Sequence, residues 1–528
     1  MSKTTKGRVK IKSCFTLISV WIWALLVGCL PSPQPDRPPG YLVIALESNP
    51  THLDPRYATD ANSARIGELI FNSLTRTDKN SRLQPDLAER WEMVDELTYL
   101  FYLRKGVTFH NGKPLTAADV KFTYESVLEP KNQSPKRGEF QALKAVDQIG
   151  PYLIRFRLAA PYAPFLENST LGIVPAGSPT NRGSGKSALI GSGPFSLEDF
   201  SPGERVVLKA NPSYWEGPPS VSGLVFRIIP DAIVRALEFK KGTVDFLQND
   251  LEPDMLPWLK KNTDASILTL QGTIFQYIGT KLDHPILKSQ EVRRAIAYAV
   301  DREAVIRHLL KGLATPATGL LSPFHWAYEP SVAPLIYNPE EAKRLLDKAG
   351  FPDPDGEGPL PRFKLSYKTT TLDLRRRIAE AFKEQLDRVG IELEVRSYEW
   401  GTFYGDIKKG NFHLYSLSWV GISDPDIYFN LFHSSSIPPY GNNRGRYQNP
   451  EIDRLLEKGR KSLSLEERKR IYSRVQKILA LELPYIPLWW TKNVVVMKPT
   501  VNGFIPYPDG GLISLKNVSF SPSLDPPA

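Results

Sequence analysis

Between residues 363 and 419, the spacing of hydrophobic side chains switches repeatedly between the period of a strand and that of a helix. This pattern predicts strands over residues 363–367, 391–397 and 412–419, separated by helices over residues 371–389 and 399–409 that end at Gly390 and Gly410. The order βαβαβ requires parallel strands joined by right-handed crossovers. Because ligands of such sheets lie beyond the carboxyl ends of the strands, we expect Ser418, Trp419 and the turn after them to form one wall of a binding cleft.

An apolar run near the N-terminus has the features of an export signal. Residues 13–27 are almost all hydrophobic, too few to span a membrane comfortably, and they follow a segment with five Lys or Arg residues and no acid. The run ends at Cys29 in the order Leu-Val-Gly-Cys, which resembles the lipobox of bacterial lipoproteins. We therefore expect a signal peptide over residues 1–28, lipidation of Cys29, and a lipid-anchored, Pro-rich tether over residues 29–40. The alternative is a plain signal peptide or a signal anchor with an incidental cysteine.

Composition narrows the class of protein further. The formal net charge is +10, and five of the positive charges belong to the predicted signal peptide, so the mature chain gives no reason to expect nucleic-acid binding. With 41% hydrophobic and 11% aromatic residues, the chain can bury large cores, and its length of 528 residues implies more than one domain. Of the 2 cysteines only Cys29 remains after cleavage, so the exported protein has no pair to oxidise.

No arrangement of residues in the sequence indicates catalysis or a resident cofactor. The Gly-Ser-Gly-Lys-Ser run at residues 183–187 lacks the first glycine of a phosphate-binding loop, which is Thr180 here, and the glycines that follow it prevent the required helix. The 7 histidines show no metal-ligand spacing, and neither Gly-x-Ser-x-Gly nor His-Glu-x-x-His occurs. His413 lies on the same strand face as Trp419, so it either lines the cleft, where it could coordinate a bound metal chelate, or is a structural histidine. We expect no catalytic residue, no metal ligand and no cofactor.

Six sequence blocks, in order along the chain, carry a resemblance to a known family. Residues 103–120 read Leu-Arg-Lys-Gly-Val-Thr-Phe-His-Asn-Gly-Lys-Pro-Leu-Thr-Ala-Ala-Asp-Val, and the other blocks lie at residues 191–195, 211–215, 291–306, 337–351 and 447–456. Together they resemble the solute-binding proteins of bacterial ABC importers, in the oligopeptide, dipeptide and nickel-binding family 5. The likeness extends over essentially the whole mature chain.

The resemblance implies an α/β fold of the two-lobed periplasmic-binding-protein kind (type II, cluster C) with an extra inserted domain and a two-strand hinge. The expected parts are a discontinuous lobe I over residues 41–75, 189–276 and 486–528, an inserted domain over residues 76–188, and lobe II over residues 277–485. Two chain crossings, near residues 272–280 and 484–490, are short extended runs rich in aromatic and β-branched residues. They are expected to form the hinge.

Large aromatic residues near the predicted cleft are candidates to contact a ligand. Trp419 ends a strand, Trp400 follows one, and Tyr277 lies at the predicted hinge; the alternative for each is a place in the core. In the family that the chain resembles, an aromatic residue at the position of Trp419 packs beside the start of a bound peptide. The full set of expected ligand-binding residues is Trp419, Ser418, Trp400, Tyr277, Tyr415, Asp424, Ser48, Asn49 and Arg444.

One position departs from the family's pattern. Peptide binders of this family commonly carry an aspartate shortly after the tryptophan, where it pairs with the α-ammonium group of the peptide. The matching residue here is Ile422, and the acids nearby are Asp424 and Asp426, in a turn one residue shorter. An arginine that some members carry three residues before the tryptophan is Ser416 here. The sequence therefore predicts the fold more firmly than the class of ligand.

The resulting hypothesis is a lipid-anchored, extracytoplasmic protein that captures a peptide-like solute and delivers it to the transmembrane subunits of an ABC permease. It is expected to act as a monomer on the periplasmic or cell-surface side of the membrane and to bind no nucleic acid. One alternative is a binder of a metal chelate, haem or oligosaccharide. The others are an exported hydrolase and a lipoprotein that signals or assembles through protein contacts.

Overall fold

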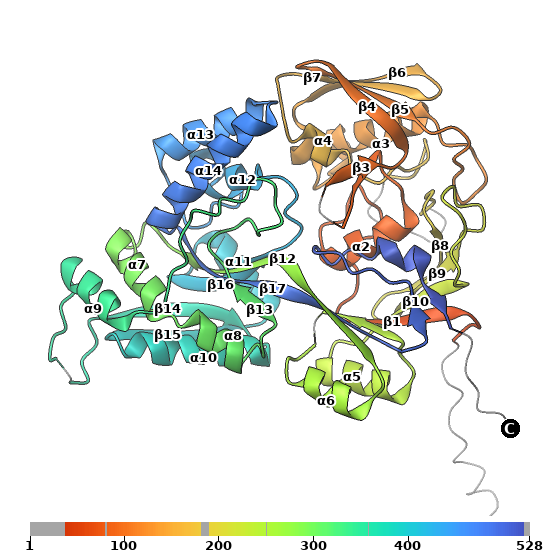
Figure 1. Cartoon of the computed structure of the whole chain (residues 1–528). Helices are drawn as coiled ribbons and strands as arrows, with labels where there is room; N and C mark the ends of the chain where they lie inside the picture. The colour runs from red at the N-terminus through yellow and green to blue at the C-terminus, as the bar shows by residue number, and fades with distance from the viewer. Residues whose placement is uncertain (1–36, 80–81, 181–188, 250, 357, 522–528) are drawn as a thin grey trace, which may run out of the picture.

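The computed structural model describes residues 37–79, 82–180, 189–249, 251–356 and 358–521 (Figure 1). The predicted signal peptide, Cys29, most of the tether and the run at residues 183–187 lie outside these ranges. Within them, no helix combines the length and the apolar character that crossing a membrane requires.

A mixed sheet, eleven-stranded in the described part of the chain, extends from one half of the molecule into the other (Figure 1). Its order is β15-β14-β16-β12-β17-β11-β1-β10-β9-β8, with β13 paired to β17. The strands are β1 (Tyr41–Leu46), β8 (Phe195–Ser201), β9 (Arg205–Ala210), β10 (Gly223–Ile228), β11 (Phe246–Gln248), β12 (Ser266–Thr280), β13 (Ala314–Pro316), β14 (Phe363–Thr370), β15 (Ile391–Tyr398), β16 (Leu414–Trp419) and β17 (Tyr485–Met497). The sheet is therefore the common scaffold of both halves of the molecule.

The predicted βαβαβ unit is present. Strand β14 pairs in parallel with β15 on one side and with β16 on the other, and the connecting helices are α10 (Asp373–Asp387) and α11 (Trp400–Lys409). Gly390 and Gly410 follow the two helices with φ of 80° each, a backbone conformation that glycine adopts without strain. The α/β class inferred from the sequence is thus confirmed.

Helices cover both faces of this part of the sheet. On one face, α7 (Gln290–Ala299), α8 (Arg302–His308), α9 (Pro339–Lys348) and α10 share a buried hydrophobic cluster with β14 and β15. On the other face, α11, α12 (Ile427–Phe432), α13 (Pro450–Lys461) and α14 (Leu465–Glu482) enclose an aromatic cluster that includes Tyr277, Tyr415 and Tyr485. We call the part built on these two clusters lobe II.

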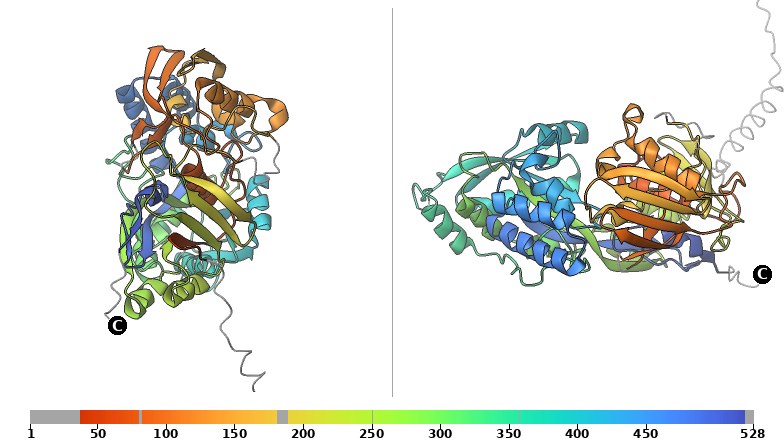
Figure 2. Two further views of the ribbon diagram at one scale, coloured as in Figure 1. Left: turned by 90° about the vertical axis from the view of Figure 1, so that its right-hand side faces the viewer. Right: turned by 90° about the horizontal axis from the view of Figure 1, so that it is seen from above.

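The remaining described residues form two further packing units. Strands β1 and β8–β11, with α2 (Ala61–Ile70), α5 (Ala232–Lys241) and α6 (Met255–Asn262), surround two clusters that define lobe I. An antiparallel sheet of β4 (Ala88–Asp95), β5 (Thr98–Leu103), β7 (Leu153–Leu158) and β6 (Leu143–Gly150) packs on α3 (Ala117–Leu128), and this unit, with α4 (Phe165–Asn168), we call the insert. Seen from above, its sheet lies beside α13 and α14 of lobe II (Figure 2). The residue limits of the three parts stay predictions.

Short elements complete the described chain. They are the strand pair β2 (Thr75–Thr77) and β3 (Leu83–Pro85), the pair β18 (Val501–Asn502) and β19 (Ser519–Phe520), and the 3-10 turns Pro130–Asn132, Arg137–Phe140, Ser434–Ser436 and Ile513–Asn517.

Strands β12 and β17 run side by side from lobe I into lobe II (Figure 1). Their antiparallel register extends from Ser266 opposite Met497 to Gly279 opposite Tyr485, with irregularities between Gln271 and Ile274 and between Gln276 and Tyr277. At one end β17 pairs with β11 of lobe I, and at the other end β12 pairs with β16 of lobe II. Such irregularities bend a ribbon locally; the role of these strands as the hinge stays a prediction.

Candidate ligand-binding site

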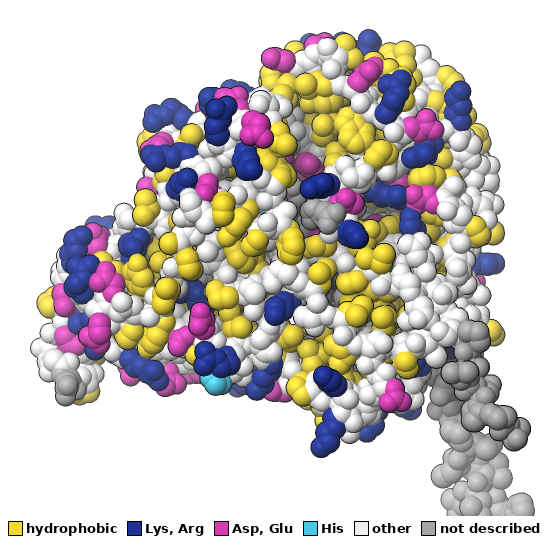
Figure 3. Space-filling view, viewed as in Figure 1, with side chains coloured by type: hydrophobic (Ala, Val, Ile, Leu, Met, Phe, Trp, Pro, Cys, Tyr) yellow, Lys and Arg dark blue, Asp and Glu magenta, His cyan; other side chains and the backbone are white. Residues whose placement is uncertain are grey.

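A cavity of about 1070 Å³ lies between the insert and lobe II. The insert contributes residues between 135 and 168, and lobe II contributes the end of α11, the segment after β16, and the segment between α12 and α13. In the space-filling view, the surface is hollowed where the two halves meet (Figure 3). The lining is a mixture of charged, polar and aromatic residues rather than a closed apolar chamber.

The turn after β16 brings two aspartates to the cavity wall, and both are engaged by arginines. Nη2 of Arg468 lies 2.6 Å from Oδ1 of Asp424. Arg460 donates to both carboxylate oxygens of Asp426, from Nε at 2.9 Å and from Nη2 at 2.8 Å. Burial raises the pKa of Asp426 against the opposing effect of Arg460. Both oxygens of Asp426 are therefore engaged, whereas Asp424 is engaged through Oδ1 and its Oδ2 is buried without a hydrogen-bond partner.

Ile422 also lines this wall. It lies between Gly421, whose φ is 68°, and the turn that contains Asp424 and Asp426. The side chain supplies an apolar surface to the cavity and packs against the aromatic cluster of lobe II. That Ile422 occupies the position of the family's aspartate stays a prediction.

Trp419, at the end of β16, is half-buried and lies under a cationic side chain. The guanidinium carbon of Arg444 is 5.3 Å from the centroid of the Trp419 ring and 5.3 Å from that of Tyr404. Nη2 of Arg444 donates to the Tyr404 hydroxyl at 3.1 Å and to Oδ1 of Asn442 at 2.9 Å. Arg444 lines the cavity and is only 5% exposed. The structure thus joins two of the predicted site residues, Trp419 and Arg444, in one cluster.

Tyr277 and Tyr415 differ from the expectation that they contact a ligand. Both are fully buried, and Tyr277 stacks on Tyr485 with ring centroids 4.0 Å apart. Their side chains point from the sheet into the aromatic core beneath the cavity wall, because the alternation of β12 and β16 turns these positions to the helix-covered face. In this structure they support the wall and are not part of its surface. Trp400 is 56% exposed and stacks on Tyr404, with ring centroids 5.2 Å apart.

Ser418 does not line the cavity and belongs to a polar group on the sheet. Its hydroxyl donates to Oε1 of Gln276 at 2.8 Å, and Nη1 of Arg375 donates to the same oxygen at 2.8 Å. Nε2 of Gln276 in turn donates to the hydroxyl of Ser416 at 2.6 Å. Gln276 and Arg375 were not singled out from the sequence, since each comes from a different segment and neither stands in a recognisable motif.

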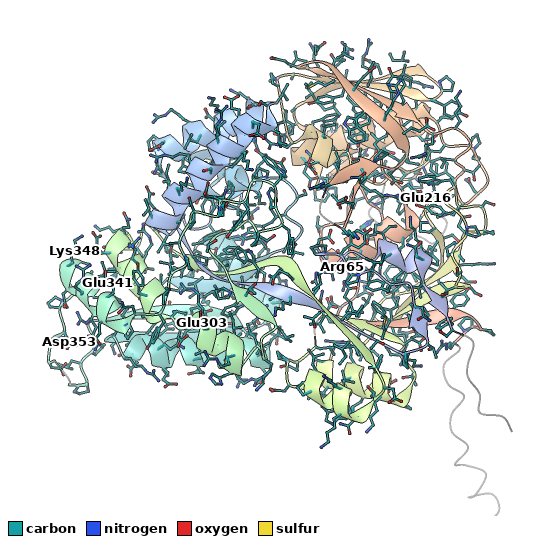
Figure 4. The ribbon with its side chains drawn as sticks, viewed as in Figure 1. Arg65, Glu216, Glu303, Glu341, Lys348 and Asp353 are labelled. Carbon is teal, nitrogen blue, oxygen red and sulfur yellow. The ribbon has the colours of Figure 1, made fainter. Side chains whose placement is uncertain are left out.

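Ser48 and Asn49 lie in lobe I, in the segment that follows β1. The carbonyl oxygen of Ser48 accepts a hydrogen bond from Nδ2 of Asn62 at 3.0 Å, and Oδ1 of Asn49 accepts one from the Gly203 amide at 3.1 Å. Neither residue lines the cavity. Arg65 of α2 lies on the side of lobe I that faces lobe II (Figure 4).

The insert's contribution to the site was not foreseen from the sequence. The amide of Ala163 donates to the carbonyl oxygen of Arg460 at 2.9 Å, so the two parts are in direct contact. Tyr162 lies under the Arg460 guanidinium at 5.6 Å, and both residues line the cavity. Burial, reinforced by the charge of Asp424, raises the pKa of Glu167 to about 7. No local signal marks these residues, because their partners lie more than two hundred positions away in the chain.

His413 packs against His284 with ring centroids 4.3 Å apart, and its Nδ1 accepts a hydrogen bond from the Ser366 amide at 3.2 Å. Burial lowers the pKa of both histidines. These contacts agree with the structural interpretation of His413. In the described residues, no three His, Cys, Asp or Glu side chains are grouped so that they could hold a metal ion.

Comparisons with known proteins agree with this architecture. Residues 82–438 match the family model described as bacterial extracellular solute-binding proteins, family 5. The chain is 29% identical over 497 residues, 90% of this chain and 91% of the other, to the oligopeptide-binding protein AppA of Bacillus subtilis (strain 168). It is 30% identical over 478 residues, 84% of this chain and 85% of the other, to heme-binding protein A of Haemophilus influenzae.

Solved structures give the same result. The structure of AppA from Bacillus subtilis in complex with a nonapeptide superposes with a TM-score of 0.80 at 28% identity, over 91% of this chain and 99% of that one. The structure of NikZ from Campylobacter jejuni in complex with Ni(L-His) superposes with a TM-score of 0.79 at 27% identity, over 92% of this chain and 100% of that one. These neighbours are type II periplasmic binding proteins, which confirms the predicted fold class.

Proposed function

The chain belongs to the bacterial extracellular solute-binding proteins of family 5, and from this membership we propose that it binds a peptide-like solute in the cavity between the insert and lobe II and delivers it to an ABC permease. Proteins of this family are extracytoplasmic, non-enzymatic binding components of ABC importers. The chain is accordingly a transport protein and not a hydrolase.

The observation that carries the proposal is the size and position of the cavity. Its volume of about 1070 Å³ slightly exceeds the range of about 300–1,000 Å³ usual for small-molecule sites. Such a volume suits a short peptide better than a single amino acid. Its walls come from two parts of the chain, so a solute in it would contact both and would favour the state in which they are close together.

Two further features support transport by opening and closing. Lobe I and lobe II are connected through the paired strands β12 and β17, and the pairing is irregular between Gln271 and Ile274. Hinges of this kind need only a few residues that absorb the change in backbone angles. We infer that ligand binding closes the lobes and that release to the permease opens them.

Membrane attachment through Cys29 is also part of the proposal. The sequence Leu-Val-Gly-Cys and the Pro-rich segment after it support a lipid anchor followed by an extended spacer. A single acyl chain binds membranes only reversibly, whereas the diacylglyceryl group of a lipoprotein supplies two chains. The tether would then hold the protein near the permease while leaving its lobes free to move.

A second candidate ligand class is a metal complex or haem. It is favoured by Ile422, which provides no carboxylate for a peptide ammonium group, and by the relatives named for haem and crystallised with Ni(L-His). The described residues offer no cluster that would bind a bare metal ion, so a complexed metal is the relevant form.

Isothermal titration of the purified mature protein against a mixture of short peptides tests the proposal. We expect saturable binding, and fractions of the mixture then identify the preferred length. Parallel titrations with haemin and with a nickel–histidine complex serve as comparison. Saturation by one of these, with no response to any peptide, would replace the first candidate by the second.

A further inference from the structure

Arg444 is a buried cation without a carboxylate partner. The residue is only 5% exposed, and among the described residues no Asp or Glu oxygen lies within 4 Å of its guanidinium group. Its known polar contacts are neutral: the Tyr404 hydroxyl and the Asn442 side-chain oxygen, both reached by Nη2. Nε is buried and has no hydrogen-bond partner. A buried charge is normally paired, because leaving it uncompensated in a low-dielectric environment is costly.

The acids nearest to the same cavity wall cannot provide that compensation. Asp424 is paired with Arg468 and Asp426 with Arg460, each at hydrogen-bond distance. Both arginine–aspartate pairs are therefore neutral as units. The carboxyl group of Glu167 is partly protonated near neutral pH, because burial raises its pKa to about 7. The Arg444 charge thus remains unmatched on this wall.

Other cations on the lobe II side strengthen the imbalance. Lys408 and Lys409, at the end of α11, line the cavity together with Arg446. The contact of Arg446 with Asp283 is long, with the nearest nitrogen and oxygen 3.7 Å apart, and both side chains are about half exposed. The wall that contains Arg444 therefore presents an excess of positive charge to whatever occupies the cavity.

The rings beside Arg444 fix its orientation. Trp419 and Tyr404 each have their centroid 5.3 Å from the guanidinium carbon, and the Tyr404 ring is itself stacked on Trp400. A planar guanidinium held in this way keeps a rigid fork of N–H donors, so the donor that faces the cavity has a fixed direction in which to meet a carboxylate oxygen. Since Nη2 is occupied and Nε is buried, Nη1 is the nitrogen that remains to donate to a group in the cavity.

We propose that Arg444 binds a carboxylate group of the transported solute, so that an acidic end, and not an ammonium end, lies beside Trp419 and Ile422. The inference rests on the proposed function, because it concerns the same cavity, and it specifies the chemical class of the solute. The preferred solute carries at least one carboxylate, as a peptide with a free C-terminus does. Two observations support this orientation. Position 422 in the cavity lining is an isoleucine and not an acid, and the Arg444 guanidinium is buried without a carboxylate partner.

The test uses tetra-alanine in four forms: free, N-acetylated, C-amidated, and blocked at both ends. Binding of each form to the mature protein is measured by isothermal titration. Because a hydrogen bond to a charged group contributes about 1.5–3 kcal/mol, the two forms with a free carboxylate should bind about tenfold to hundredfold more tightly than the two amides. In Arg444→Gln, this preference should fall to within about twofold.

Controls separate recognition from folding. Arg396→Gln removes the same charge from an exposed ion pair with Glu394 on β15, away from the cavity, and should keep the preference of the unchanged protein. Arg444→Lys retains the charge but not the fork, so it should recover part of the carboxylate preference. Near-ultraviolet circular dichroism and the melting temperature without ligand show whether each variant is folded. If Arg444→Gln does not fold, the comparison is made with Arg444→Lys alone. An unchanged preference of Arg444→Lys for the free carboxylate would then contradict recognition by the guanidinium group.

Several results would overturn the inference. Equal binding of acids and amides by the unchanged protein would refute a carboxylate subsite while leaving peptide transport intact. A carboxylate preference that persists in Arg444→Gln would assign the subsite to another residue. If no form of the peptide binds, the proposed binding of a peptide is contradicted. The anion site at Arg444 is then tested separately, by the melting temperature in the presence of sulfate. If sulfate raises the melting temperature of the unchanged protein and of Arg396→Gln more than that of Arg444→Gln, the result supports an anion site at Arg444. Equal increases in melting temperature would refute it.

Discussion

Arg460 of α13 holds Asp426 through two parallel hydrogen bonds, from Nε at 2.9 Å and from Nη2 at 2.8 Å. The same guanidinium lies 3.6 Å above the centroid of the Phe429 ring, and the carbonyl oxygen of Arg460 accepts a hydrogen bond from Ala163 of the insert. One residue thus ties the turn after β16 to α12 and to the insert. This arrangement explains why Asp426, although it lines the cavity, is not available to a solute.

Blocking the N-terminus of a bound peptide should therefore have little effect. With Ile422 in place of a carboxylate, and with Asp424 and Asp426 paired to arginines, we expect free and N-acetylated forms of one ligand to bind within a few-fold of each other. Loss of an ammonium–carboxylate hydrogen bond would otherwise weaken binding about tenfold to hundredfold. Titration calorimetry with the matched pair measures the ratio.

Two variants sharpen this comparison. Ile422→Asp restores a carboxylate at the cavity wall and should create a preference of about tenfold for the free N-terminus. Asp426→Asn should lower the free energy of unfolding by about 1–3 kcal/mol, because it leaves the half-buried Arg460 without its partner. A large penalty for acetylation in the unchanged protein that disappears in Asp424→Asn or Asp426→Asn would contradict the prediction.

Attachment to the membrane should depend on Cys29. Since this is the only thiol left after cleavage of the predicted signal, Cys29→Ala removes the lipidation site and should shift the protein from the membrane to the soluble fraction or stall its processing. Fractionation and metabolic labelling with a radioactive fatty acid measure both outcomes. Normal cleavage with unchanged membrane retention would rule out the lipid anchor.

Ligand binding should compact and stabilise the protein. At a hundredfold excess over the dissociation constant, a ligand that binds only the folded state adds about 2.7 kcal/mol to the free energy of unfolding. If the lobes rotate about β12 and β17, the radius of gyration in solution scattering should also decrease on binding. A tight ligand that raises the melting temperature but leaves the scattering curve unchanged would show that the cavity fills without hinge closure.

Glu68 of α2 should make lobe I less stable in alkali. Burial, and then the nearby charge of Asp509, raise the pKa of Glu68 to about 8, against the lowering effects of Arg65 and of the amides of Leu512 and Ile513. A raised pKa means that the folded state holds the proton more tightly than the unfolded chain. The associated stability is fully present below the ordinary glutamate pKa of 4.5 and is lost as the pH rises through about 8.

The corresponding variant is Glu68→Gln. The glutamine side chain keeps an oxygen that can accept a hydrogen bond from the Leu512 amide, but it cannot ionise. Above pH 8 the free energy of unfolding of the variant should therefore exceed that of the unchanged protein by about 1–3 kcal/mol, and in acid the two values should be equal. Urea denaturation at several pH values gives the difference. An equal pH dependence of both proteins would show that Glu68 does not control it.

The sequence predicted the parallel part of lobe II well because its determinants are local. Apolar residues at strand and helix spacing and the glycines at 390 and 410 define β14, α10, β15, α11 and β16 to within three residues at each end. Trp419 and Arg444 were also identified as candidates. The orientation of Tyr277 and Tyr415 was not, since which face of a strand is buried depends on helices that pack there from distant segments.

The rest of the site could not be read from the sequence. The pairs Asp424–Arg468 and Asp426–Arg460 join the turn after β16 to two helices that follow some forty residues later, and Tyr162 and Glu167 arrive from the insert. Surface ion pairs such as Glu341–Arg344 and Lys348–Glu291 have equally plain sequence signals but lie at the outer end of lobe II (Figure 4). Charge alone therefore does not distinguish a cavity wall from a solvated helix.

The crossing of β12 and β17 has a consequence for the order of events during export. Strand β11 of lobe I pairs with β17, where Phe246 lies opposite Met497. Since Met497 is near the end of the chain, this pairing cannot form until almost the whole chain is present. Until that stretch has been translocated, the nascent lobe I exposes an unpaired strand edge of the kind that invites wrong partners. The protein can complete its first lobe only after its second has emerged, which couples correct folding to delivery of the entire polypeptide.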